Sequence, residues 1–281
     1  MSLRIVDAGA LTTIQDRGRF GLAHLGVPRA GALDAPAADL ANRLVGNASG
    51  AALLETTAAG VSFDTGRAHL LAVTGARCAV RVAGRWVAFA EPVSVPAGAL
   101  VEVGPAIDGM RSYVAVAGGI DVDPVLGSRS TDTLAWVGPP VLRAGDVLPV
   151  GPTNGDLVGV DVDPRRRPPS VLRLHPGPHA DWFAADVLAR LDGASYEVAS
   201  ESNRVGLRLS GRPIHRTRSG ELLSEGMVLG AVQVPPSGQP VVFLNDHPAT
   251  GGYPVVAVLH EDDLPVCAQA RPGDVLTLRP A

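Results

Sequence analysis

Lysine is absent from this sequence: the 24 Lys+Arg residues are all arginine. The chain therefore cannot supply a P-loop lysine, a Schiff-base lysine or the lysine to which biotin is attached. A genome that favours arginine codons is the simplest cause of this composition, but the chemical exclusion holds whatever the cause. If ATP or biotin takes part in the function, another chain must supply much of the machinery.

Aromatic residues, cysteines and long hydrophobic runs are also scarce. Aromatics make up 4% of the chain and the net charge is -4, which leaves neither a stacking platform nor a basic field for nucleic acid. Cys78 and Cys267 lack metal-ligand spacing, and the N-terminus lacks the layout of a signal peptide. No apolar run approaches the ~20 residues of a membrane-spanning helix. We therefore expect a reduced, cytoplasmic protein that binds no metal, nucleic acid or membrane.

Short apolar runs, bounded by single glycines, prolines, asparagines or aspartates, dominate what is present. The chain of 281 residues has 33 Gly and 24 Pro, scattered rather than collected into tracts. This pattern predicts a mainly β fold of barrels or sandwiches with few helices. The expected strands are 69–84, 87–96, 99–104, 111–119, 171–177, 205–211, 231–236, 240–246 and 274–280.

Two helices are predicted. In residues 34–45, Asp34 can cap the N-terminus, Pro36 fits the first turn and Gly46 ends the helix. Residues 179–191 place apolar side chains partly on one face, so this helix is expected to pack rather than to carry chemistry. The tryptophans are expected in the core: Trp86, Trp136 and Trp182.

A repeated sequence suggests two β units. RAGDVLPVG at 143–151 and RPGDVLTLRP at 271–280 each combine an arginine, a Gly-Asp turn and an apolar strand. Between them, DVDPRRRPPS at 161–170 has the composition of a solvated linker. The sequence therefore predicts units at 1–160 and 161–281, with the second carrying most of the site.

Four polar clusters stand out: LTTIQDRGRFG (11–21), SNRVGLRLSG (202–211), LLSEGMVLGAVQVPPSGQP (222–240) and LNDHPATGGYP (244–254). The last three lie at ends of expected strands, where a rigid β scaffold presents functional groups. Their amide, guanidinium, carboxylate and hydroxyl groups suit a small carboxylate or amide ligand. Asn203, Ser224 and Asp246, taken singly, are equally consistent with turns. Among the histidines, only His247 is kept as a candidate, and the others, including His179, are interpreted as structural.

The first cluster raises a separate question, because a turn there needs only Gly18 and Asp16. Gln15 and Arg17 add an amide and a planar cation from which a turn gains nothing. We expect this stretch to be functional and to face the same cleft as the C-terminal clusters. The alternative is that Asp16 and Arg17 form structural ion pairs.

Seven motifs together resemble the family of allophanate hydrolase subunit 2, the carboxyltransferase-domain family that includes KipA and PxpC. They are TTIQDRGRFG, GVPRAGALD, ANRLVGN, LGSRSTD, SNRVGLRLSG, SEGMVLGAVQVPPSGQPVVFL and DHPATGGYP. The resemblance as a whole runs from about Gly9 to the C-terminus, nearly the full chain. The resemblance implies cyclophilin-like β-barrel units. Pro248-Ala249 departs from the Gln-Thr of the family pattern, so no role is assigned to these two positions.

The resemblance implies a subunit of an ATP-dependent 5-oxoprolinase, which opens 5-oxoproline to glutamate. The implied partners are a subunit 1 protein (allophanate hydrolase subunit 1, KipI or PxpB) and a LamB/YcsF-type (PxpA) subunit. ATP would bind the complex rather than this chain alone, no biotin would be carried here, and the isolated chain would be inactive. Two alternatives stay open: a carboxyltransferase subunit of a biotin-dependent urea or amide carboxylase, and a KipA-like regulator that binds a kinase inhibitor.

Under this resemblance, Glu225 or Asp246 is the candidate base that positions water. Arginines are candidates for a substrate carboxylate or phosphate, and amide side chains for the lactam amide. The candidate substrate-binding residues are Gln15, Asp16, Arg17, Asn203, Arg204, Gln233 and Thr250.

Overall fold

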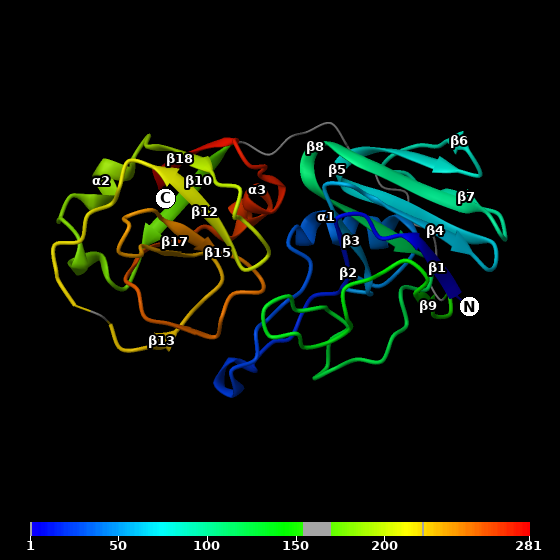
Figure 1. Cartoon of the computed structure of the whole chain (residues 1–281), viewed down its shortest axis with the longest axis horizontal. Helices are drawn as coiled ribbons and strands as arrows, with labels where there is room; N and C mark the ends of the chain where they lie inside the picture. Colours follow the sequence, from blue (N-terminus) through cyan, green and yellow to red (C-terminus); the bar gives the residue numbers. More distant parts are fainter. Residues whose placement is uncertain (1, 154–169, 221) are drawn as a thin grey trace. The chain divides into compact units, whose positions relative to one another are not determined.

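The computed structural model describes residues 2–153, 170–220 and 222–281 (Figure 1). These residues form two compact units, and membership does not simply follow the order of the sequence. Two short segments of the N-terminal half, Phe20–Arg29 and Thr133–Ala135, belong to the second unit. The expected boundary between residues 160 and 161, and the expected linker up to residue 169, lie outside the described residues.

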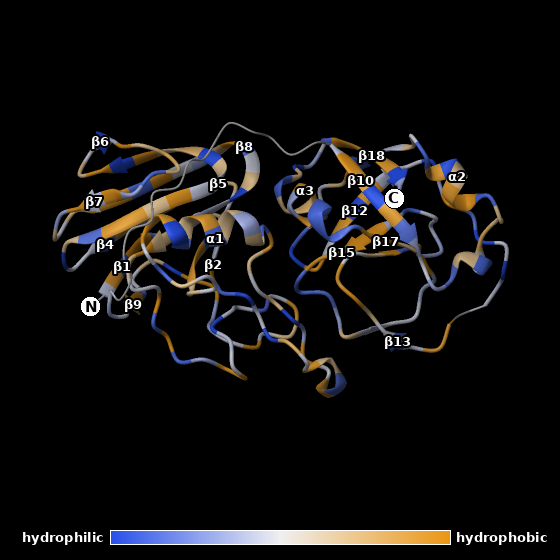
Figure 2. Cartoon of the chain, turned by 180° about the vertical axis from the view of Figure 1, so that it is seen from behind, coloured by the Kyte–Doolittle hydropathy of each residue, from blue (hydrophilic) through white to orange (hydrophobic). Residues whose placement is uncertain are grey.

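The first unit is built on a nine-stranded sheet with the strand order β2-β3-β8-β4-β1-β9, in which β5 also pairs with β6, β7 and β8. Every strand pairing in this sheet is antiparallel. Apolar residues of β1, β4, β5 and β8 form its main core, and Figure 2 shows the apolar stretches along β4 and β5. The strands are β1 (Ser2–Asp7), β2 (Leu11–Gln15), β3 (Leu53–Thr57), β4 (Val61–Thr65), β5 (His69–Val82), β6 (Arg85–Trp86), β7 (Val93–Val95), β8 (Leu100–Val116) and β9 (Val147–Pro149).

Helix α1 (Ala35–Leu44) packs against strands β5 and β8 of the first unit. Its N-terminus is capped by Asp34, whose carboxylate accepts a hydrogen bond from the backbone N–H of Ala37 at 3.1 Å. The face with Ala38, Ala41 and Leu44 is buried in a second apolar cluster. The prediction of a helix over 34–45 with an Asp34 cap is therefore confirmed.

The second unit contains a closed barrel with the strand order β10-β17-β14-β15-β12-β11-β18. A parallel pairing of β10 with β18 closes it, and its other pairings are antiparallel. A separate two-stranded sheet joins β13 to β16. The strands are β10 (Val171–Pro176), β11 (Ser195–Val198), β12 (Gly206–Gly211), β13 (Glu225–Gly226), β14 (Ala231–Gln233), β15 (Val241–Phe243), β16 (Thr250–Gly251), β17 (Val255–Leu259) and β18 (Val275–Pro280).

The repeated Gly-Asp sequence forms the same turn in both units. The backbone N–H of Arg143 donates to the Asp146 carboxylate at 2.8 Å, and that of Arg271 donates to Asp274 at 2.9 Å. Each turn also exchanges two backbone hydrogen bonds with another strand of its own unit, at Ile5 in the first and at Val198 in the second. The two sequences therefore build matching local structures, which supports the interpretation of two related β units.

The mainly β prediction is confirmed, but several details are wrong. The expected strands 99–104 and 111–119 are parts of one continuous strand, β8, which also includes the residues between them and ends at Val116. Residues 179–191 do not form one helix, because Phe183 is extended and bridges Arg216 between two short helical segments. These segments are η2 (Ala180–Trp182) and α2 (Val187–Leu191), and the remaining helices are η1 (Ala23–Leu25), η3 (Glu261–Asp263) and α3 (Leu264–Gln269).

The prediction that the tryptophans lie in the core is wrong. Trp86 is 65% exposed and Trp136 is 71% exposed. The indole of Trp86 is covered by the Arg81 guanidinium at 4.0 Å, so a cation–π contact takes the place of burial. Trp182 is half-buried.

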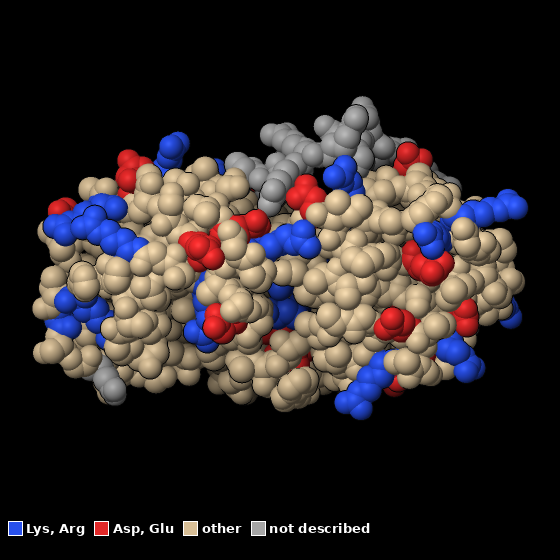
Figure 3. All heavy atoms as spheres, turned by 45° about the horizontal axis from the view of Figure 1, so that its top comes forward, with Lys and Arg blue, Asp and Glu red and all other residues tan. Residues whose placement is uncertain are grey.

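Acidic and basic side chains are interspersed on the face shown in Figure 3. This arrangement agrees with the small net charge of -4. No helix among the described residues is long and apolar enough to cross a membrane.

Candidate functional site

Asp246 and Arg204 form a fully buried ion pair in the second unit, with exposed side-chain fractions of 0% and 1%. The guanidinium binds both carboxylate oxygens, with Arg204 Nε 2.9 Å from one and Nη2 3.0 Å from the other. Arg204 comes just before β12 and Asp246 just after β15, so the antiparallel pairing of these two strands brings the residues together. Asp246 also donates its backbone N–H to the Arg204 carbonyl. A two-pronged contact of this kind fixes both side chains.

Thr133 completes the coordination of Asp246. Its backbone N–H and its hydroxyl both donate to one carboxylate oxygen, at 2.9 and 2.7 Å. Asp246 therefore accepts four hydrogen bonds from protein groups. Because both oxygens are occupied, this carboxylate is better suited to holding neighbouring groups in place than to accepting a proton from water.

Asn203 precedes Arg204 in the sequence and is exposed. Its side-chain oxygen accepts hydrogen bonds from the backbone N–H groups of Val205 at 2.8 Å and Gly206 at 3.3 Å, which makes a local turn. The turn uses only the oxygen of the amide. The Nδ2 group remains a donor that this turn does not use.

Glu225 and Thr250 are brought together by the small sheet of β13 and β16, in which Glu225 pairs with Gly251 and Gly226 with Thr250. The Glu225 side chain is 42% exposed, so this carboxylate is far more accessible than that of Asp246. The Thr250 hydroxyl belongs to an exposed residue. This pairing places an accessible carboxylate and a hydroxyl on one short ribbon.

His179 holds Glu225. Its Nε2 lies 3.0 Å from a Glu225 carboxylate oxygen, and its Nδ1 accepts the backbone N–H of Val255 at 3.2 Å. Because Nδ1 is an acceptor, the neutral ring carries its proton on Nε2 and donates it to Glu225. The interpretation of His179 as merely structural is therefore too narrow, and its spacing from Glu225 in the sequence gives no signal of this contact.

Gln233 is buried beside the β13–β16 ribbon. Its Nε2 donates to the Tyr253 carbonyl at 3.0 Å and contacts the Met227 sulfur at 3.6 Å. A side chain added at Gly251 would lie 2.8 Å from this Nε2, so glycine permits the close approach. Gln233, Glu225 and Thr250 thus form one group, and Asn203, Arg204 and Asp246 form another.

In the first unit, Asp16 organises the loop that follows β2. One of its oxygens accepts hydrogen bonds from the Gly18 N–H (2.7 Å) and the hydroxyls of Ser128 (2.6 Å) and Ser130 (2.5 Å). The other accepts the backbone N–H of Arg129 at 2.6 Å. Every one of these donors is neutral. The LGSRSTD motif at 126–132 thus supplies most of the partners of Asp16, which the sequence alone does not reveal.

Gln15 is fully buried at the end of β2. Its Nε2 donates to the Thr13 hydroxyl and to the Thr131 carbonyl, both at 3.0 Å. Its Oε1 has no hydrogen-bond partner among the described residues. An unsatisfied buried acceptor is costly, so this oxygen is a candidate for a ligand or water contact.

Arg17 differs from its two neighbours in being 58% exposed. One terminal nitrogen, Nη2, lies 3.2 Å from Asp39 and 2.8 Å from the Ser49 hydroxyl. An exposed ion pair contributes little to stability. Within the described part of the chain, a structural ion pair is therefore present for Arg17 but not for Asp16, while a substrate role for these residues stays a prediction.

His247 follows Asp246 and is buried against Phe243, with ring centroids 5.9 Å apart. Burial lowers the pKa of the imidazole, and the Arg29 charge lowers it further, against opposing effects of the Pro248 carbonyl and Asp246. Its Nδ1 lies 2.8 Å from the Pro248 carbonyl oxygen. The ring is therefore neutral near pH 7 and stabilises the loop.

Comparison with known proteins identifies the class. The family model for the carboxyltransferase domain, subdomain A and B, matches residues 25–280. The chain therefore belongs to this family, and the resemblance found in the sequence is confirmed.

Individual proteins and a solved structure are also similar to this chain. The chain is 39% identical to the C subunit of 5-oxoprolinase from Escherichia coli over 95% of its own length and 87% of that protein. It is 33% identical to urea amidolyase of Saccharomyces cerevisiae over 99% of its length, but covers 16% of that larger protein. The solved structure of TTHA0988 superposes with a TM-score of 0.88 at 39% identity, and the chain spans 55% of it.

Proposed function

We propose that this chain is the C subunit of an ATP-dependent 5-oxoprolinase, which converts 5-oxoproline to glutamate. The observation that carries the proposal is the 39% identity to the corresponding E. coli protein, which extends over 95% of this chain and 87% of that protein. A match of this length includes both units rather than one shared module. It therefore favours the same type of subunit.

The chemistry requires an activated amide, donors for the developing oxyanion and a carboxylate that positions water. Glu225 is the better base of the two candidates, because it is 42% exposed and oriented by His179. Asp246 has both oxygens occupied by Arg204 and Thr133 and acts as a positioning residue for the adjoining loop. Thr250, on the strand paired with Glu225, is a candidate donor.

Substrate contacts are assigned to groups that keep donors or acceptors for a ligand. Arg17 is exposed and can present its fork to a carboxylate or phosphate, and Asn203 can donate through Nδ2. Gln15 contributes the unsatisfied Oε1, and Gln233 is buried beside Glu225 and Thr250. Asp16 and Arg204 hold these groups in place.

The partners follow from the same proposal. The E. coli relative is one lettered subunit of its enzyme, which implies further subunits. For these we propose a subunit 1 protein of the KipI/PxpB type and a LamB/YcsF-type (PxpA) subunit. ATP would bind the assembled complex, because this chain has no lysine for a P-loop. The chain alone would be inactive.

A second candidate is supported by the match to urea amidolyase of S. cerevisiae, at 33% identity over 99% of this chain. In this case the chain would be the carboxyltransferase part of a biotin-dependent urea or amide carboxylase. Biotin would have to be carried on another chain, because this one has no lysine.

Co-expression with the subunit 1 and LamB/YcsF-type proteins separates the two candidates. ATP hydrolysis by the purified complex is measured with 5-oxoproline, with urea and without either. The first proposal predicts stimulation by 5-oxoproline and none with this chain alone. Turnover only with urea and a biotinylated carrier would favour the second candidate and contradict the first.

A further inference from the structure

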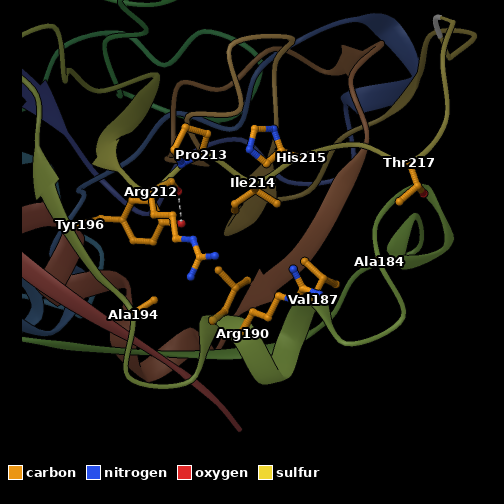
Figure 4. Close-up of a pocket in the computed structure, with 11 residues that line it drawn as sticks. Ala184, Val187, Arg190, Ala194, Tyr196, Arg212, Pro213, Ile214, His215 and Thr217 are labelled. Carbon is orange, nitrogen blue, oxygen red and sulfur yellow. Dashed lines mark hydrogen bonds between the residues drawn. The ribbon is translucent and has the colours of Figure 1, made fainter.

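A pocket in the second unit is lined by none of the residues to which a catalytic or substrate-binding role is given above. It has a volume of about 150 Å³ and lies between α2, strand β11 and the segment that follows β12 (Figure 4). Val187 and Leu191 of α2 and Ile214 of the opposite segment contribute its apolar walls. These three side chains are at most 7% exposed, whereas Arg190 and Arg212 of the lining are exposed, so the pocket has a buried apolar floor and opens to solvent beside the arginines.

The ring of Tyr196 forms a further wall, and its hydroxyl fixes the neighbouring backbone by donating to the Arg212 carbonyl at 2.8 Å. Figure 4 shows the Arg212 side chain reaching into the space between Tyr196 and α2. Burial raises the pKa of Tyr196, whereas the charge of Arg212 opposes this shift, which agrees with a guanidinium close to the phenol. The phenol therefore stays neutral, and the positive charge in this wall comes from Arg212.

Arg212 has no acidic partner among the residues that the structure describes. Arg190, the second arginine of the lining, differs, because its Nε is 2.8 Å from Asp186 one turn earlier in the helix. A guanidinium beside an apolar cavity pairs best with a carboxylate, which it can bind through two parallel hydrogen bonds. The electrostatics of the pocket thus favour a single negative charge next to an apolar body.

We propose that this pocket binds a small monocarboxylate whose body is apolar, with the carboxylate on Arg212. The volume fits this class, since a cavity of about 150 Å³ lined by apolar side chains can hold benzene. A lactam is not favoured here, because its polar ring amide would face Val187, Leu191 and Ile214. The site is independent of the proposed 5-oxoprolinase activity.

The test titrates the isotopically labelled full-length chain with benzoate and with isovalerate, followed by NMR of the backbone amides. Saturable shifts are expected at Ala194, Ile214 and Thr217. Benzamide, the uncharged match of benzoate, should bind about tenfold more weakly or not at all, since it loses the charged pairing.

Three variants make the result specific. Arg212→Gln should weaken benzoate about tenfold and bring it level with benzamide. Arg208→Gln removes an exposed arginine of β12 that does not line the pocket, and should leave binding unchanged. Ala194→Leu should fill the cavity and abolish binding of both acids, with melting curves confirming that each variant is folded.

The proposal is overturned if neither acid gives saturable shifts, or if the shifts map to other residues. It is equally overturned if Arg212→Gln binds benzoate as tightly as the unaltered chain. Because no partner subunit or ATP is present in this experiment, its failure leaves the 5-oxoprolinase proposal untouched.

Discussion

Asp16 in the first unit and Asp246 in the second unit perform the same local task with different chemistry. Each accepts four hydrogen bonds and joins segments that are far apart in the sequence. Asp16 is half-buried and uses only neutral donors, whereas Asp246 is fully buried and is paired with Arg204. The difference follows from burial, because a fully desolvated carboxylate needs a compensating charge and a partly hydrated one does not.

The residues that follow the two aspartates diverge in the same way. Arg17 is 58% exposed, while His247 is buried and has a lowered pKa. In both places the aspartate holds neighbouring backbone in position, and the residue after it differs in exposure and charge: Arg17 is exposed and charged, whereas His247 is buried and neutral near pH 7. Of the two residues that follow the aspartates, only Arg17 therefore presents a charged side chain to solvent.

The largest expected effect is the loss of the buried ion pair. Asp246→Ala should lower the free energy of unfolding by about 3–5 kcal/mol, because it leaves the Arg204 guanidinium buried without its carboxylate. Urea denaturation measures the change. As a matched control, the double variant Arg204→Met with Asp246→Leu should recover much of the loss, since no charge remains to be desolvated. A single variant that costs less than about 1 kcal/mol would show that the pair is solvated.

Removing Asp16 should cost less. Asp16→Ala leaves four donors without an acceptor, but water can reach this half-buried site, so we expect a loss of about 2–3 kcal/mol. Asp16→Asn should cost about half as much, because one oxygen can still serve Gly18, Ser128 and Ser130. Thermal denaturation compares the two variants. Equal losses in Asp16→Ala and Asp246→Ala would contradict the role assigned to burial.

Arg17→Lys tests the neighbour of Asp16. The change keeps the charge and removes the two-pronged fork, so it should weaken substrate binding by about 1.5–3 kcal/mol, roughly ten- to hundredfold. Stability should change by less than about 0.5 kcal/mol, because the Asp39 pair is exposed. Affinity for 5-oxoproline in the complex and the melting temperature of the chain are measured together. A variant that melts much earlier but binds normally would assign Arg17 to structure.

The pH dependence of stability tests the role of His247, the residue that follows Asp246. Its pKa in the folded chain lies below the ordinary value of 6.5, so the unfolded chain binds the proton more readily. Stability contributed by this group is therefore complete above pH 6.5 and declines as the pH falls through and below that value. In His247→Asn, stability should fall less steeply between about pH 7.5 and 5.5 than in the unaltered chain. Identical slopes would show that His247 is not responsible.

The sequence predicts the elements whose ends carry a clear local signal. Asp34, Pro36 and Gly46 mark α1, and strands such as β10, β12 and β18 have clear boundaries. It fails within β8, where residues between Leu100 and Val116 read as a break although the strand continues, with register shifts against β5. Such irregularities depend on the neighbouring strand and leave no local pattern.

The candidate site is less predictable, because its contacts depend on pairing of distant strands. Arg204 and Asp246 are 42 residues apart, and only the β12–β15 pairing brings them together. Thr133 and His179 were missed for the same reason, since neither lies in a cluster with its partner. Residue type nevertheless pointed to groups that the structure brings into contact: Arg204 with Asp246, and Glu225 with the strand of Thr250.

Conversion of 5-oxoproline to glutamate by the complete complex tests the proposed function most directly. The purified complex, with ATP, is compared with preparations that lack this chain and with a complex containing Glu225→Gln. We expect glutamate to form only when this chain is present, and Glu225→Gln to lower turnover about a hundredfold or more while the complex still assembles. Undiminished glutamate formation without this chain would contradict the proposed function.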